Sequence, residues 1–116
     1  MKENKLLQLA QEFAINIIEI ADNLKAMGEK GFADQIKRSA TSISANIAEG
    51  NYPQSRLDMI SKFEIALKES NETENWLLVF NNTKLISDDI YKMLHNKLIK
   101  IKILLINSIK TLKSKL

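Results

Sequence analysis

Apolar residues recur along the chain every three or four positions, the spacing that gathers side chains on one face of an α-helix. No stretch shows the strict alternation of a half-buried β-strand. The glycines and the single proline fall between or at the ends of the periodic segments, at Gly28, Gly31, Gly50 and Pro53. The pattern therefore predicts four helices, over about residues 3–27, 32–49, 55–80 and 87–114.

Polar residues at the expected helix starts support these boundaries. Ser55 followed by Asp58 resembles a capping box, in which side chains satisfy the free N–H groups of the first turn. Ser87 can cap the last helix, and the two acidic residues after it suit the positive end of the helix dipole. Four long amphipathic helices with short connections predict an all-α fold, an antiparallel up-down-up-down four-helix bundle forming a single domain over residues 1–116.

The segment QIKRSATSISANIAEG, residues 35–50, differs from the rest of the chain in its concentration of small residues. At about 100° per residue its apolar positions form one stripe, and a polar stripe lies beside it rather than opposite. The polar stripe consists of Gln35, Arg38, Ser39, Ser42, Asn46 and Glu49. This placement indicates a seam at the edge of the core, where another helix can approach closely.

If a neighbouring helix covers the seam, its polar atoms need partners, because an unsatisfied buried group costs about 1–3 kcal/mol. Arg38 would then bind a carboxylate, and the candidates are Glu49, Glu69, Glu72 and Glu74. A hydrogen-bonded helix junction is one interpretation of the seam. A ligand or substrate site on the same residues is the alternative.

Two helices carry more apolar residues than one core stripe explains. In the last helix the expected core positions are Ile90, Leu94, Leu98, Ile101, Leu105 and Leu112, and a second stripe contains Ile99, Ile103 and Ile106. In the first helix a second stripe contains Leu7, Ala14 and Ile18. Because monomers rarely expose contiguous apolar patches, we expect these six residues to form an interface between copies of the chain.

The net charge of +3 is unevenly distributed, since residues 84–116 carry eight Lys and two Asp, whereas residues 1–83 carry an excess of acidic side chains. A basic end can attract the phosphates of RNA or DNA, and Lys100, Lys110 and Lys113 are the candidate contacts. Lys-rich helices are also common as simple solvated surfaces. The lysines project around much of the helix and do not line one face.

Known catalytic patterns do not emerge from the residue types and their spacing. Cysteine is absent, and the lone His95 has Lys92 where a di-iron bundle would have Glu. Glu69, Glu72 and Glu74 fit salt bridges better than a metal site. We therefore expect a non-enzymatic protein with no cofactor and no metal. The apolar runs are too short or too interrupted for a signal peptide or membrane span, which predicts a cytoplasmic protein.

The seam segment also resembles a known family, the small bacterial four-helix bundle proteins also called 23S rRNA intervening-sequence proteins, which are ribosomal-protein-like. The family pattern Gln-Ile-x-Arg-[Ser/Ala]-Ala-x-Ser-Ile-x-x-Asn-Ile-Ala-Glu-Gly is matched from Gln35 to Gly50. A second block, residues 66–77, is similar to the family's third-helix signature and contains Glu72 and Trp76. The loop Asn51-Tyr52-Pro53-Gln54 departs from relatives in which a basic, Gly-containing stretch follows.

The resemblance implies a bundle that assembles as a ring-like homopentamer. It also implies a relationship to an accessory protein of diversity-generating retroelements, which binds nucleic acid and a reverse transcriptase. It brings no catalytic residues. Two functional hypotheses follow: a homo-oligomeric scaffold that binds RNA or DNA through its basic last helix, or a structural scaffold that binds a protein partner without nucleic-acid affinity.

Overall fold

The computed structural model describes the backbone of residues 2–116 and the side chains of residues 5–116. Within that range it contains four helices and no strand: α1 (Lys2–Ala26), α2 (Lys30–Gly50), α3 (Arg56–Asn82) and α4 (Asp88–Ser114). The predicted all-α class with four helices is confirmed. Each helix end lies within two residues of the position expected from the sequence.

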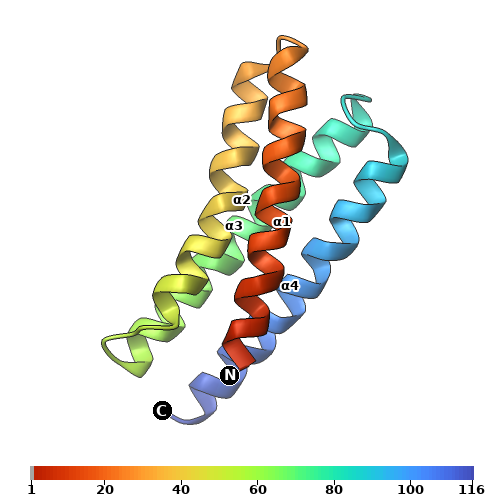
Figure 1. The fold of residues 1–116 in the computed structure, drawn as a ribbon. Coiled ribbons are helices and arrows are strands. Elements are labelled where there is room, and N and C mark those ends of the chain that lie inside the picture. Colours follow the sequence, from red (N-terminus) through yellow and green to blue (C-terminus); the bar gives the residue numbers. More distant parts are fainter. Residues whose placement is uncertain (1) are drawn as a thin grey trace.

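The four helices form an elongated bundle of 47 × 21 × 19 Å. Figure 1 shows the α1–α2 and α3–α4 connections at one end, and the α2–α3 connection with both termini at the other. Contacts between α2 and α3 join the start of one helix to the end of the other. Phe32, early in α2, meets Phe80, late in α3, and Gly50, at the end of α2, meets Phe63, in the first half of α3. Each helix packs against two others, in the cyclic order α1, α2, α3, α4.

The core follows the apolar stripes of the four helices. Phe13, Phe63 and Phe80 are fully buried in it, together with leucines and isoleucines from every helix. The buried positions of α4 are Leu94, Leu98, Ile101, Leu105 and Ile109, whereas Ile90 and Leu112 are only partly buried. Alanines at positions 10, 14 and 21 are buried on α1 and allow the neighbouring helices to approach closely.

Two helix C-termini end in the same hydrogen-bond motif. After α1, the N–H of Glu29 donates to Leu24 O (2.9 Å) and that of Gly28 to Lys25 O (3.0 Å), with Gly28 at φ 88°. This is a Schellman motif, in which the residue after the cap adopts a left-handed conformation that suits glycine. After α3 the equivalent position is Lys84, at φ 62°, and Leu85 N–H donates to Phe80 O (2.9 Å).

Side chains cap the N-termini of α3 and α4 as expected from the sequence. Ser55 Oγ accepts from the N–H of Asp58 (3.0 Å), and Asp58 Oδ2 accepts from the N–H of Gln54 (3.1 Å). Ser87 Oγ accepts from the N–H of Ile90 (3.2 Å). These bonds satisfy donors that the first helical turn leaves free, so they fix where both helices begin.

Gly50 has a different role from the one its position suggests. It is the last residue of α2, and the cap that follows, Asn51, keeps an ordinary right-handed φ of −73°. A Cβ on Gly50 would lie 2.6 Å from Cε1 of Phe63 and 3.3 Å from Cβ of Lys62. Glycine is therefore required here by the close approach of α3, not by a left-handed turn.

Candidate functional site

The polar stripe of α2 faces α3, and Ser39 is its most deeply buried member. Ser39 Oγ donates to Ile36 O (3.2 Å) and lies 2.8 Å from Thr73 Oγ1 on α3. Thr73 Oγ1 is also 2.9 Å from Glu69 O. Both hydroxyls are completely buried, and their bonds to each other and to the backbone remove the cost of that burial.

Arg38 connects the exposed edge of this seam to two carboxylates of α3. Its Nη1 lies 3.1 Å from Glu69 Oε1, and its Nη2 donates to Glu72 Oε2, which also accepts from Trp76 Nε1 (3.2 Å). The hydrogen bond from Arg38 lowers the pKa of Glu72 below its usual value. Of the four candidate carboxylates, Glu69 and Glu72 are therefore the partners of Arg38.

The other members of the polar stripe bond within α2 or face solvent. Ser42 Oγ donates to Arg38 O (2.7 Å), and Asn46 Nδ2 donates to Ser42 O (2.8 Å). Gln35 and Glu49 are exposed, and neither side chain has a hydrogen bond to another group among residues 5–116. The seam is therefore a packed helix junction in which most polar side chains bond to each other, to the backbone or to carboxylates of α3. Glu49 is the one charged residue of the seam without an ion pair in that range.

An aromatic cluster extends the seam toward the α1–α2 connection. The ring centroid of Phe32 lies 5.9 Å from that of Trp76 and 5.6 Å from that of Phe80. We did not expect Phe32 in this cluster, because its spacing alone does not identify the helix that it meets. The Trp76–Phe80 spacing of four residues on α3 is the only sequence signal of the cluster.

A second ionic network joins α3 to α4. Glu74 lies 2.7 Å from Lys102 Nζ and 2.9 Å from His95 Nε2, and the His95 ring stacks on Tyr91 with centroids 5.3 Å apart. The hydrogen bond from Lys102 lowers the pKa of Glu74, and that from His95 adds to the effect against the opposing effect of burial. His95 therefore contacts α3, and Glu74 is not a partner of Arg38.

The second apolar stripe of α4 is exposed in the isolated chain. Ile103 is 52% and Ile106 is 41% exposed, while Ile99 is partly buried. His95 and Lys102 identify the side of α4 that faces α3. By helical geometry the isoleucine stripe lies between that side and the outer surface. Leu78, on the adjacent part of α3, is a further exposed apolar residue, at 46%.

The second stripe of α1 does not adjoin the isoleucine stripe. The hydrogen bond from Lys97 Nζ to Asn16 Oδ1 (2.7 Å) identifies the side of α1 that faces α4. Leu7, Ala14 and Ile18 project to the other side of the core stripe, toward α2. Leu7 and Ile18 are partly buried and Ala14 is only 6% exposed, so the structure places Ala14 in the chain's own core. The sequence pattern could not distinguish this position because each helix packs against two neighbours.

The three candidate nucleic-acid contacts differ in their surroundings. Lys100 and Lys110 are exposed, and neither forms an ion pair with any residue from 5 to 116. Lys113 pairs with Glu64 of α3, with 3.0 Å between Nζ and Oε2. The part of the chain that the structure describes contains no group of three or more His, Asp or Glu side chains placed to hold a metal ion. None of the helices searched has the length and hydropathy of a membrane span.

Comparisons with known proteins agree with this architecture. A solved structure of a protein with unknown function, from the S23 ribosomal protein family of Bacteroides thetaiotaomicron, matches with a TM-score of 0.91. It is 42% identical in sequence, and the match covers 95% of this chain and 99% of that one. Among curated proteins no match was found. The family model described as 23S rRNA-intervening sequence protein matches residues 2–107, so the chain belongs to that family.

Proposed function

We propose that this chain is a non-enzymatic scaffold of the cytoplasm, an antiparallel four-helix bundle that assembles with further copies of itself. The observation that carries the proposal is the exposure of Ile103 and Ile106, at 52% and 41%, on a helix whose other face fills the core. Burial of apolar surface stabilises an assembly by roughly 25 cal/mol per Å². Self-association through this stripe is therefore the most direct way to remove it from water.

The chemistry of the seam supports a binding role over a catalytic one. Ser39, Arg38 and Glu72 are each already bonded to a neighbouring group, and the exposed Glu49 carboxylate is the one charged group of the seam without an ion pair among residues 5–116. A nucleophile or general base needs a free atom within reach of a substrate. The seam instead holds α2 against α3, which provides a rigid support for surfaces on the outside of the bundle.

A ring of five copies is the assembly we propose, and its number rests on the resemblance to homopentameric relatives. A matched pair of substitutions tests the interface. Ile103→Glu places a charge in the proposed contact and is expected to produce monomers. Ile15→Glu changes another exposed isoleucine, on α1, and is expected to leave the assembly intact. An intact assembly in Ile103→Glu, measured by sedimentation velocity, overturns this interface.

Nucleic-acid binding is a second candidate activity, favoured by the exposed and unpaired ammonium groups of Lys100 and Lys110 within residues 5–116. A ring would repeat these charges in every copy and strengthen the field on a phosphate backbone. The test is fluorescence anisotropy with RNA and DNA of equal length at several salt concentrations. Lys100→Gln combined with Lys110→Gln is expected to weaken binding and flatten its salt dependence.

Lys30→Gln is the control for this experiment, because the Lys30 ammonium already pairs with Asp34 (2.7 Å). Equal binding by the two lysine variants and the wild type rejects α4 as the nucleic-acid surface. Absence of binding by the assembled wild type at low salt favours the alternative, a scaffold for a protein partner without nucleic-acid affinity.

A further inference from the structure

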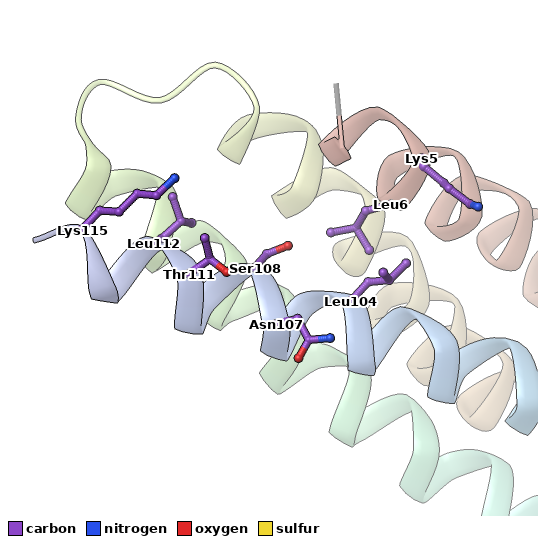
Figure 2. A pocket seen from close by; sticks show the side chains of 8 residues that line it. All are labelled: Lys5, Leu6, Leu104, Asn107, Ser108, Thr111, Leu112 and Lys115. Carbon is purple, nitrogen blue, oxygen red and sulfur yellow. The ribbon is translucent and has the colours of Figure 1, made fainter.

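A groove lies between the first turns of α1 and the last turns of α4, with a volume of about 440 Å³. Figure 2 shows its lining: leucines from both helices, and the short polar side chains of α4 between them. The lining residues are Lys5, Leu6, Leu104, Asn107, Ser108, Thr111, Leu112 and Lys115. A groove of this volume that combines leucines with polar side chains suits an inserted ring that carries a polar group, such as tyrosine.

Tyr52 is the most exposed of the large hydrophobic side chains that the structure describes, at 89%. It lies in the α2–α3 connection and borders a hollow formed with Glu49, Asp58 and Lys62. Burial of this ring within its own chain is negligible, although tyrosine is one of the residues that contribute most when an interface covers them. The loop therefore presents an aromatic ring that has no packing partner in the described chain.

The charges around the two features have opposite sign. Glu49 and Asp58 flank Tyr52, with Lys62 as the only cation lining the same hollow. Glu49 forms no ion pair among residues 5–116, and the Asp58 carboxylate accepts only the N–H of Gln54. Lys5 and Lys115 line the groove, and neither forms an ion pair within those residues. Contact between the two features would bring unpaired acids to unpaired lysines.

Arg56, at the start of α3, donates to Lys115 O (2.6 Å) in the same chain, so the two features are near each other at this end but open to different sides of the bundle. The groove belongs to the α1–α4 side of the bundle and the hollow to the α2–α3 side, which is opposite in the cyclic order of the helices. The first turns of α1, the last turns of α4 and the α2–α3 connection, which carry the lining residues, lie at the end of the bundle that carries the termini (Figure 1). A contact between two different faces of the chain is head-to-tail, and it repeats from copy to copy as a ring where the rotation between copies closes and as an open filament where it does not.

We infer that Tyr52 of one copy inserts into the α1–α4 groove of a second copy of this chain, with Glu49 and Asp58 facing Lys5 and Lys115. This inference rests on the proposed function, because it requires that the chain assembles with itself. The contact has a direction: the α2–α3 loop of one copy inserts, and the groove of the next copy receives it. The isoleucine stripe on the other side of α4 is a separate part of the interface.

Crosslinking tests the insertion directly, because the wild-type chain has no cysteine. Gln54→Cys chains, which keep Tyr52 and carry the thiol in the same exposed loop, and Ser108→Cys chains are given different tags, co-expressed and treated with a short bismaleimide. A covalent dimer containing both tags is the expected product. The control pairs Gln54→Cys with Lys92→Cys, which is exposed near the opposite end of α4. If the Ser108 pair crosslinks no better than this control, the inference is wrong.

Charge exchange provides a second test that a purely structural role would not satisfy. Glu49→Lys and Lys115→Glu are each expected to weaken self-association roughly two- to fivefold, as for exposed ion pairs, and the double variant is expected to recover. Tyr52→Ala is expected to weaken it about 30-fold, the loss typical of a central interface tyrosine. No recovery in the double variant and no effect of Tyr52→Ala overturn the inference.

Native mass spectrometry of the wild type and its variants distinguishes failure of the proposed self-assembly from failure of the Tyr52–groove contact. An assembled wild type whose Tyr52→Ala variant assembles equally well contradicts the groove contact and leaves the proposed scaffold in place. A monomeric wild type contradicts both. An assembly lost in Tyr52→Ala and in Ile103→Glu supports both parts of the interface.

Discussion

The backbone of Gly50 contacts the ring of Phe63 so closely that a single added carbon would lie 2.6 Å from Cε1 of that ring. Phe63 is fully buried and cannot move away without disturbing the core around it. Glycine is therefore required at the end of α2, because α2 and α3 approach each other too closely there for a larger residue.

Gly50→Ala is expected to destabilise the chain by about 1–3 kcal/mol, the range for overpacking a well-filled core. Gly31→Ala is the matched control. Its Cβ would meet no atom within 4 Å, and its φ is not left-handed, so the substitution is expected to stabilise α2 by up to about 1 kcal/mol. Urea unfolding at one protein concentration measures both. Equal stability of the two variants would contradict the close contact.

Lys84 occupies the left-handed position of the Schellman motif after α3, where a side chain is strained. Lys84→Gly is expected to stabilise the chain by about 1 kcal/mol, the penalty of a left-handed conformation for a residue with a Cβ. Lys84→Ala keeps the Cβ and should give no comparable gain. Thermal unfolding compares the two, and a gain for alanine as large as that for glycine would exclude backbone strain as the cause.

The pKa of Glu74 is lowered chiefly by Lys102, so its charged form is favoured by folding. The resulting stabilisation is present above the ordinary pKa of 4.5 and is lost as the pH falls through the lowered value. Glu74→Gln is therefore expected to cost about 1 kcal/mol at neutral pH, with the difference from wild type shrinking below pH 4.5.

Glu64→Gln is the control for Glu74, because it removes a more exposed pair with Lys113. Its cost should be smaller at neutral pH, since solvent screens that pair more strongly. Unfolding curves recorded from about pH 3 to about pH 8, in steps of about half a pH unit, provide the comparison. A difference for Glu74→Gln that grows in acid would reverse the assigned sign.

The buried hydroxyls of Ser39 and Thr73 form the central polar contact between α2 and α3, with their oxygens 2.8 Å apart. Ser39→Ala and Thr73→Val are each expected to cost about 1 kcal/mol. The double variant should cost less than the sum, because the first substitution already removes the shared bond. Additive costs in this double-mutant cycle would show that the two hydroxyls act independently.

Local sequence patterns were sufficient for the features that depend on one helix. The three- and four-residue spacing located the four helices, and the caps at Ser55 and Ser87 were recognised from residue type and position. The polar stripe of α2 was recognised for the same reason, since adjacency on a helix face follows from spacing alone.

Features that depend on a neighbouring helix were predicted less well. Arg38 had four candidate carboxylates, and only the register of α3 against α2 selects Glu69 and Glu72. Ala14 was expected at an interface, but the close approach of neighbouring helices buries it. The α1–α4 groove had no sequence signal, because its lining comes from two helices at opposite ends of the sequence.

Self-assembly through the isoleucine stripe of α4 is measured by native mass spectrometry of the wild type beside Ile103→Glu. We expect one assembly of several copies for the wild type, with the mass of a pentamer, and a monomer for the variant. A monomeric wild type, or an Ile103→Glu protein that retains the wild-type mass, would contradict it.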